Sequence, residues 1–114
     1  MNSAQWLVKT LKRRGVGLIF ALCGNGLKPF LDACDHQMQV IDVGNEQSAA
    51  YMADTWGRLT KRIGVVAVSA GPGHTNALTG LANAFWDSGP MLLISGCAQV
   101  QKSVGWVIFR SLIK

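Results

Sequence analysis

The sequence lacks any apolar stretch long enough to cross a bilayer. Its longest apolar stretches span residues 16–24 and 91–98, well below the roughly 18 residues that a membrane-spanning helix needs. Its two histidines and three cysteines show no metal-ligand spacing, and an odd number of cysteines argues against a disulfide framework. We therefore expect a soluble, cytoplasmic chain without a membrane partner, in which Cys23, Cys34 and Cys97 are buried free thiols.

Acidic residues are also scarce, and none precedes Asp32. Six Asp and Glu stand against eleven Lys and Arg, which gives a formal net charge of +5. The basic residues cluster only at Lys9, Lys12, Arg13 and Arg14. A basic amino terminus is also typical of a mitochondrial presequence, but Trp6, Leu7 and Leu11 form an apolar stripe, which favours a core-facing helix. The cluster then indicates the solvated end of that helix, and we expect no nucleic-acid partner.

The 114 residues allow one domain, or part of one. Mostly apolar runs predict four strands at residues 16–22, 39–43, 63–70 and 91–95. Helical patterns lie between them at residues 3–14, 29–35, 46–59 and 75–86, with Asn45 as a predicted N-cap. This alternation predicts the α/β class, as a parallel sheet with helices on both faces.

Apolar spacing in the last two predicted helices indicates which faces should pack on the sheet. One set of candidates is Ala49, Ala50, Ala53, Trp56 and Leu59. The other is Leu78, Leu81, Ala82 and Phe85. Because both sets follow helical spacing, we expect both to face the core.

Three polar or glycine-rich features follow predicted strands. They are the turn at Gly24, Asn25 and Gly26, the acid Glu46, and the turn at Gly71, Pro72 and Gly73. Because the carboxyl ends of parallel strands share one edge, these features should face one crevice. Taken singly, each has an ordinary explanation, since glycine-rich turns are common and a glutamate suits the first turn of a helix.

Longer motifs surround these features. Residues 43–60 read VGNEQSAAYMADTWGRLT, residues 69–77 read SAGPGHTNA, and residues 80–96 include GLANA and DSGPMLLISG. Together they resemble the pyrimidine-binding domain of thiamine-diphosphate-dependent enzymes of the acetolactate synthase, 2-hydroxyacyl-CoA lyase and oxalyl-CoA decarboxylase type. The resemblance runs from about Gly17 to Ser95.

The resemblance implies thiamine diphosphate as cofactor and a role for each matching residue. Glu46 would be catalytic, hydrogen-bonding the ring nitrogen of the aminopyrimidine and favouring the tautomer that takes the thiazolium proton. Gly71, Pro72 and Gly73 would let the backbone pass close to that ring. The remaining implied cofactor-binding residues are Gly24, Asn25 and Asn76. Asn25 would either help to select the substrate or only tolerate positive φ in its turn.

The resemblance also implies what else the reaction needs. The family holds diphosphate and magnesium on a separate C-terminal domain through a Gly-Asp-Gly to Asn motif, which nothing in this chain resembles. It places each active site between two chains, so we expect a homo-oligomer or pairing with full-length relatives. We therefore expect residues 1–103 to be a partial domain that is inactive alone, and residues 104–114 to be a divergent tail that forms either a replacement strand or an exposed edge.

The family's reaction implies a small-molecule substrate. It makes or breaks a carbon–carbon bond beside a carbonyl, with a 2-keto acid or a 2-hydroxyacyl thioester as the donor. Two other readings remain open. One is a non-catalytic fragment that pairs with full-length relatives. The other is a Rossmann-like nucleotide-binding unit built on the Gly24 turn and Asp42, although Lys28 and Pro29 stand where a third glycine would be expected.

Overall fold

The computed structural model of the chain describes residues 1–97 and the backbone of residues 107–110. The predicted boundary between residues 103 and 104 lies outside the described residues. The elements are α1 (Ser3–Arg13), β1 (Leu18–Ala21), α2 (Lys28–Cys34), β2 (Gln39–Asp42), α3 (Glu46–Thr60), β3 (Gly64–Val68), α4 (Pro72–Trp86), β4 (Met91–Ser95) and β5 (Val107–Arg110). The predicted α/β class is confirmed.

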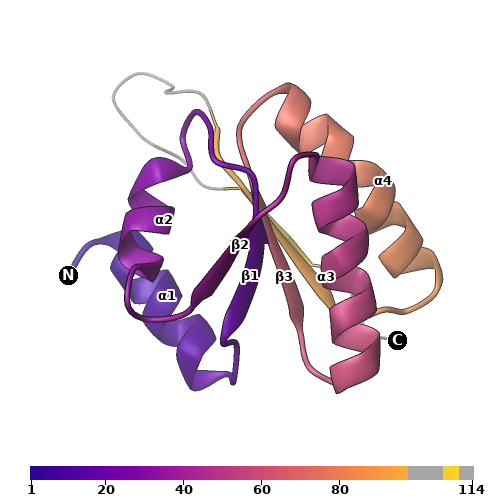
Figure 1. The fold of residues 1–114 in the computed structure, drawn as a ribbon, viewed down its shortest axis with the longest axis horizontal. Helices are drawn as coiled ribbons and strands as arrows, with labels where there is room; N and C mark the ends of the chain where they lie inside the picture. Colours follow the sequence, from indigo (N-terminus) through magenta and orange to yellow (C-terminus); the bar gives the residue numbers. More distant parts are fainter. Residues whose placement is uncertain (98–106, 111–114) are drawn as a thin grey trace.

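The strands form one sheet in the order β2-β1-β3-β4-β5 (Figure 1). The first four are parallel, with Phe20 opposite Val66 and Val66 opposite Leu93. The backbone of β5 pairs antiparallel with β4, so part of the tail forms a strand at this edge. Helices α1 and α2 cover one face of the sheet, and α3 and α4 cover the other (Figure 1).

Two hydrophobic clusters lie on the two faces of the sheet. Because side chains alternate along a strand, neighbouring residues such as Val65 and Val66 enter opposite clusters. The cluster under α1 and α2 includes Ile19, Leu27, Phe30, Cys34, Ala67 and Ile94. The cluster under α3 and α4 includes Phe20, Ala49, Ala50, Ala53, Ala77, Ala84 and Leu93. The helices of the second face thus contribute mainly alanine to the core.

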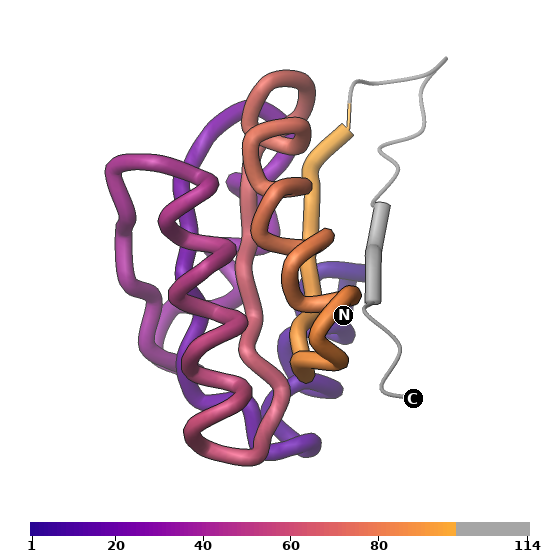
Figure 2. Tube along the Cα trace, turned by 90° about the vertical axis from the view of Figure 1, so that its right-hand side faces the viewer, coloured from indigo at the N-terminus to yellow at the C-terminus, as the bar shows by residue number. Residues whose placement is uncertain are grey.

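Small residues set the contact between α3 and α4, which run side by side (Figure 2). A Cβ atom added to Gly80 would collide with the Ala50 Cβ and lie 3.0 Å from the Ala50 carbonyl carbon and 3.1 Å from the Tyr51 nitrogen. The two helices therefore meet almost backbone to backbone. Such close approach leaves no room for large side chains between them.

This contact overturns part of the predicted core. Ala49, Ala50 and Ala53 are buried as expected, but Trp56 is 42% exposed and Leu59 is 79% exposed. On α4, Leu81 is half-buried, whereas Leu78, Ala82 and Phe85 are exposed. The prediction was wrong for these larger residues because alanine and glycine occupy the buried faces.

Two further expectations about the core need correction. Trp6 is 58% exposed, so the stripe on α1 is buried through Ala4, Val8 and Leu11 instead, with Leu7 at its margin. Strand β2 is mostly exposed, because it forms an edge of the sheet and is not enclosed on both faces. The near-continuous burial expected of a parallel strand holds for β1, β3 and β4.

A buried carboxylate also joins α3 to α4. Asp54 is 3% exposed and accepts two hydrogen bonds from Arg58, at 2.8 and 3.0 Å. Asn83 of α4 donates a third, at 3.1 Å, and Arg58 lies 3.5 Å from Asp87. Because these donors satisfy the carboxylate, its burial is compatible with a stable fold.

The cysteines do not share one environment. Only Cys34 is buried, while Cys97 is half-buried and Cys23 is exposed. Burial raises the pKa of the Cys34 thiol to about 11, so this thiol stays protonated at neutral pH. The prediction of buried thiols is therefore confirmed for Cys34 and wrong for Cys23.

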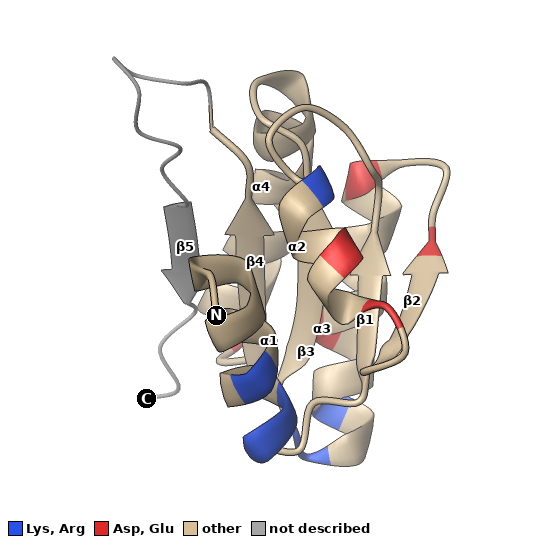
Figure 3. Cartoon of the chain, turned by 90° about the vertical axis from the view of Figure 1, so that its left-hand side faces the viewer, with Lys and Arg blue, Asp and Glu red and all other residues tan. Residues whose placement is uncertain are grey.

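The charges of the chain are unevenly placed. Figure 3 shows basic residues at the end of the sheet where the strands begin. They are Lys12, Arg13 and Arg14 before β1 and Lys61 and Arg62 before β3, all of them exposed. The solvated helix end predicted from the sequence is confirmed. In the described part of the chain, no helix combines the length and apolar character needed to cross a membrane.

We predict that Gly80→Ala destabilises the chain by about 1–3 kcal/mol, because the added methyl group forces α3 and α4 apart. This loss outweighs the gain of about 1 kcal/mol that alanine brings to a helix interior. Denaturant unfolding of wild type and variant measures the difference. The control is Thr79→Ala at the exposed neighbouring position, and equal stability of Gly80→Ala and wild type would contradict the packing argument.

Candidate functional site

The loops after β1, β3 and β4 meet at the carboxyl edge of the sheet. The backbone N–H of Ala70 donates to the carbonyl of Asn25 at 3.2 Å. A Cβ atom on Gly24 would lie 2.5 Å from the Ser69 Cβ, and one on Gly96 would lie 2.6 Å from the Asn25 oxygen. The chain after β1 leads to one face of the sheet and the chain after β3 to the other (Figure 1). Such a switch point is where open α/β sheets bind ligands.

Glu46 is the first residue of α3, at this same edge. The predicted N-cap is confirmed, because the Asn45 side chain accepts hydrogen bonds from the backbone N–H groups of Gln47 at 2.9 Å and Ser48 at 3.2 Å. The Glu46 side chain is half-buried. Its negative charge is favoured at a helix N-terminus, whose unpaired N–H groups carry partial positive charge.

Helix α4 begins three residues earlier than the sequence predicts. Gly71 is its N-cap, with φ at +71°, and Pro72 and Gly73 form its first turn. Pro72 fits because the first helical N–H needs no partner within the helix. The Gly-Pro-Gly segment thus begins the helix soon after β3 ends at Val68, and the next turn of α4 lies beside α3.

Three of the predicted site residues come together between the two helix N-termini. The Asn76 Nδ2 donates to Glu46 Oε2 at 3.2 Å. A Cβ atom on Gly73 would lie 3.2 Å from Glu46 Oε1 and would collide with the Ser69 hydroxyl. The carboxylate therefore lies against α4, with one oxygen beside a residue that has no side chain.

Ser69 is a contact residue that the sequence analysis did not select. Its side chain lies beside both Gly24 and Gly73, and so connects the loop after β1 to the start of α4. A small polar residue two positions before the Gly-Pro-Gly segment was the available signal. Asn25 is exposed, and its contact with this cluster is made through its backbone carbonyl.

The site suits a planar nitrogen heterocycle better than a metal ion. The carboxylate and the amide offer an acceptor and a donor, and Glu46 Oε1 lies beside Gly73, which has no side chain. Among the described residues, no group of three or more His, Cys, Asp or Glu could hold a metal. Lys28, at the start of α2, is paired with Asp32 at 2.8 Å.

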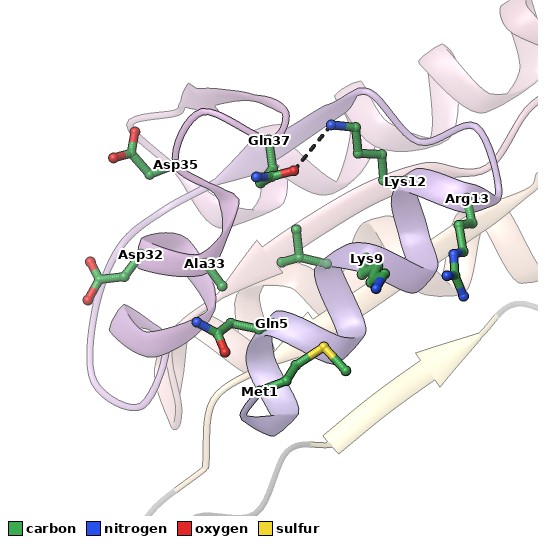
Figure 4. A pocket seen from close by; sticks show the side chains of 10 residues that line it. Met1, Gln5, Lys9, Lys12, Arg13, Asp32, Ala33, Asp35 and Gln37 are labelled. Carbon is green, nitrogen blue, oxygen red and sulfur yellow. Dashed lines mark hydrogen bonds between the residues drawn. The ribbon is translucent and has the colours of Figure 1, made fainter.

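A separate groove lies between α1 and α2 (Figure 4). It is lined by Gln5, Lys9, Lys12, Asp32 and Gln37 among others, and Lys12 Nζ donates to Gln37 Oε1 at 3.2 Å. None of the predicted site residues lines it. Its helices cover the face of the sheet opposite to α3 and α4, so it is distinct from the Glu46 cluster.

The fold and the cluster define a doubly wound α/β domain with a carboxylate at its switch point, the class that binds organic cofactors at this edge. The chain belongs to the thiamine pyrophosphate enzyme family. The family model described as "Thiamine pyrophosphate enzyme, N-terminal TPP binding domain" matches residues 1–109. The resemblance seen in the sequence is confirmed. The match favours this family over a Rossmann-like nucleotide-binding unit.

Similar proteins include two kinds of enzyme. The chain is 40% identical over 113 residues to the acetolactate synthase large subunit of Buchnera aphidicola subsp. Schizaphis graminum, covering 96% of the chain and 19% of that protein. It is 44% identical over 89 residues to 2-hydroxyacyl-CoA lyase 2 of Xenopus laevis, covering 77% and 14%. It is 40% identical over 114 residues to the acetolactate synthase isozyme 3 large subunit of Escherichia coli, covering 96% and 19%. The chain thus spans less than a fifth of the length of these relatives.

We predict that Asn45→Ala lowers the free energy of unfolding by about 1 kcal/mol, because two N–H groups at the start of α3 lose their acceptor. Asn45→Asp should stay close to wild type, since aspartate caps equally well. Thermal unfolding of the three proteins measures the effect. Equal loss in both variants would show that the side-chain cap is not what stabilises this helix end.

Proposed function

We propose that this chain supplies the pyrimidine-binding half of a thiamine-diphosphate site, with Glu46 as the residue that contacts the aminopyrimidine. The observation that carries the proposal is the position of the Glu46 carboxylate, half-buried between two helix N-termini and hydrogen-bonded to Asn76. The family supports it, since the matching domain is described as TPP-binding.

Each residue of the site has a proposed role. The Glu46 carboxylate would hydrogen-bond a ring nitrogen and hold or release the proton there, which a partly desolvated carboxylate does better than a solvated one. Gly73 leaves the space for the ring, and Gly71, Pro72 and Gly24 shape the backbone around it. When bound, thiamine diphosphate supplies the electron sink for making or breaking a carbon–carbon bond beside a carbonyl.

We further propose that this half-site is completed by other protein parts. The described residues offer no metal-ligand cluster, so the diphosphate and its magnesium would be held by a second domain. That domain would come from a second copy or from a full-length relative, with this chain inactive alone. The substrate would be a 2-keto acid or a 2-hydroxyacyl thioester, and the name of the 2-hydroxyacyl-CoA lyase supports the second of these. Asn25 would contact that substrate.

A hybrid protein tests the role of Glu46. The matching segment of the Escherichia coli isozyme 3 large subunit is replaced by this chain, and deuterium exchange at the reactive carbon of bound thiamine diphosphate is followed by NMR. We expect Glu46→Gln to slow exchange by at least about 100-fold, because the amide cannot take up the proton. The control is Ser48→Ala, an exposed neighbour on α3. Unchanged exchange in Glu46→Gln would remove Glu46 from this role.

Calorimetric titration of the isolated chain with thiamine diphosphate and magnesium tests the half-site. We expect no binding tighter than about 100 μM, because the pyrimidine contacts alone bury little of the cofactor. Size-exclusion chromatography and circular dichroism on the same sample show whether the chain is folded. Tighter binding to the folded chain would mean that it holds a usable site without a second domain.

A further inference from the structure

The two oxygens of the Glu46 carboxylate have different surroundings. Oε2 accepts the hydrogen bond from Asn76 Nδ2 at 3.2 Å. Oε1 lies on the side of Gly73, where an added Cβ would approach it to 3.2 Å. Gly73 and Asn76 are three residues apart on α4, so they lie one above the other on the same face of that helix. One face of α4 thus lies against both oxygens, with a donor at one and a residue that has no side chain at the other.

At the first position of a helix, the helix itself does not fix the orientation of a glutamate side chain. Its side chain has three rotatable bonds, and in the first turn it can reach water or nearby backbone N–H groups. The hydrogen bond from Asn76 crosses from α4 to α3 and joins residues 30 positions apart. It therefore selects one orientation of the carboxylate that the local sequence around Glu46 does not select.

We propose that Asn76 is a positioning residue that holds Glu46 Oε2 and thereby keeps Oε1 next to Gly73. What Oε1 does there rests on the proposed function, but the positioning itself does not. An amide suits this task because it donates a hydrogen bond without carrying charge. Aspartate at the same place would have the same size, could not donate when ionised and would repel the carboxylate.

The position of Asn76 argues against a mainly structural role. It is exposed on α4, outside the hydrophobic clusters. Alanine has the higher helix propensity, so loss of the side chain should not weaken the helix. The face of α4 that packs on the rest of the domain is made by Gly73, Ala77, Gly80 and Ala84. Removal of the amide is thus expected to release Glu46 and leave the fold intact.

NMR of the isotope-labelled full chain tests this without any cofactor. Three-bond scalar couplings across χ1 and χ2 of Glu46 report whether its side chain occupies one rotamer or several. In the wild type we expect couplings of a single rotamer. In Asn76→Ala and Asn76→Asp we expect loss of that pattern and averaged couplings, with backbone amide spectra otherwise close to wild type outside the site.

Two further variants separate positioning from general effects on α4. Thr79→Ala changes an exposed residue one turn away and should leave the Glu46 couplings unchanged. Asn76→Gln keeps the amide donor on a longer side chain and should restore part of the single-rotamer pattern. Averaged couplings in the wild type, or a single rotamer retained in both Asn76→Ala and Asn76→Asp, would overturn the proposal.

The outcome is independent of the test of Glu46 in the hybrid protein. If Asn76 orders Glu46 but Glu46→Gln exchanges deuterium normally, the positioning stands and the proposed function fails. If Glu46 is ordered without Asn76 but Glu46→Gln blocks exchange, the proposed function stands and the positioning fails. Where both hold, Asn76→Ala in the hybrid should slow exchange by about 10- to 100-fold, as expected for a misplaced catalytic group.

Discussion

The arrangement of the site depends on the close contact of α3 with its neighbours. At Gly80 the two long helices meet almost backbone to backbone. Gly64 lies closer still to α3, since an added Cβ atom would collide with the carbonyl of Ala53, so α3 is also fixed against β3. Because these contacts involve backbone and single methyl groups, few side-chain movements can widen them. The buried Asp54 and its donors join the helices further along their length. The start of α3 is therefore fixed relative to α4, and this brings Glu46 within reach of Asn76.

Much of this fold could be predicted from the sequence, because its signals are local. Apolar runs identified the four parallel strands, Asn45 was recognised as a cap, and the motifs around Glu46 and Gly71 identified the family. The buried faces of the long helices were predicted less well. Hydrophobic periodicity ranks residues by how apolar they are, so it predicted that Trp56 and Phe85 would be buried. The contact selects for small size instead, and a glycine such as Gly80 gives no hydrophobic signal.

The internal geometry of the site needed the structure. The sequence placed Glu46 and the Gly-Pro-Gly segment at one edge of the sheet, because that follows from topology alone. It could not show that Gly71 begins α4, since glycine and proline at a strand end are equally typical of a turn. The pairing of Asn76 with Glu46 depends on this earlier start and on the distance between two helices. Neither is encoded in any short stretch of the chain.

The uneven placement of charge along the strand direction has a consequence for molecular encounter. The exposed cations Lys12, Arg13, Arg14, Lys61 and Arg62 lie at one end of the sheet, and Glu46 lies at the other. At physiological ionic strength, fields decay over about 8 Å, which is less than the extent of the molecule along its axes. These cations therefore attract anions to the end remote from Glu46. The field of these five cations therefore does not help an anionic ligand to reach the Glu46 end.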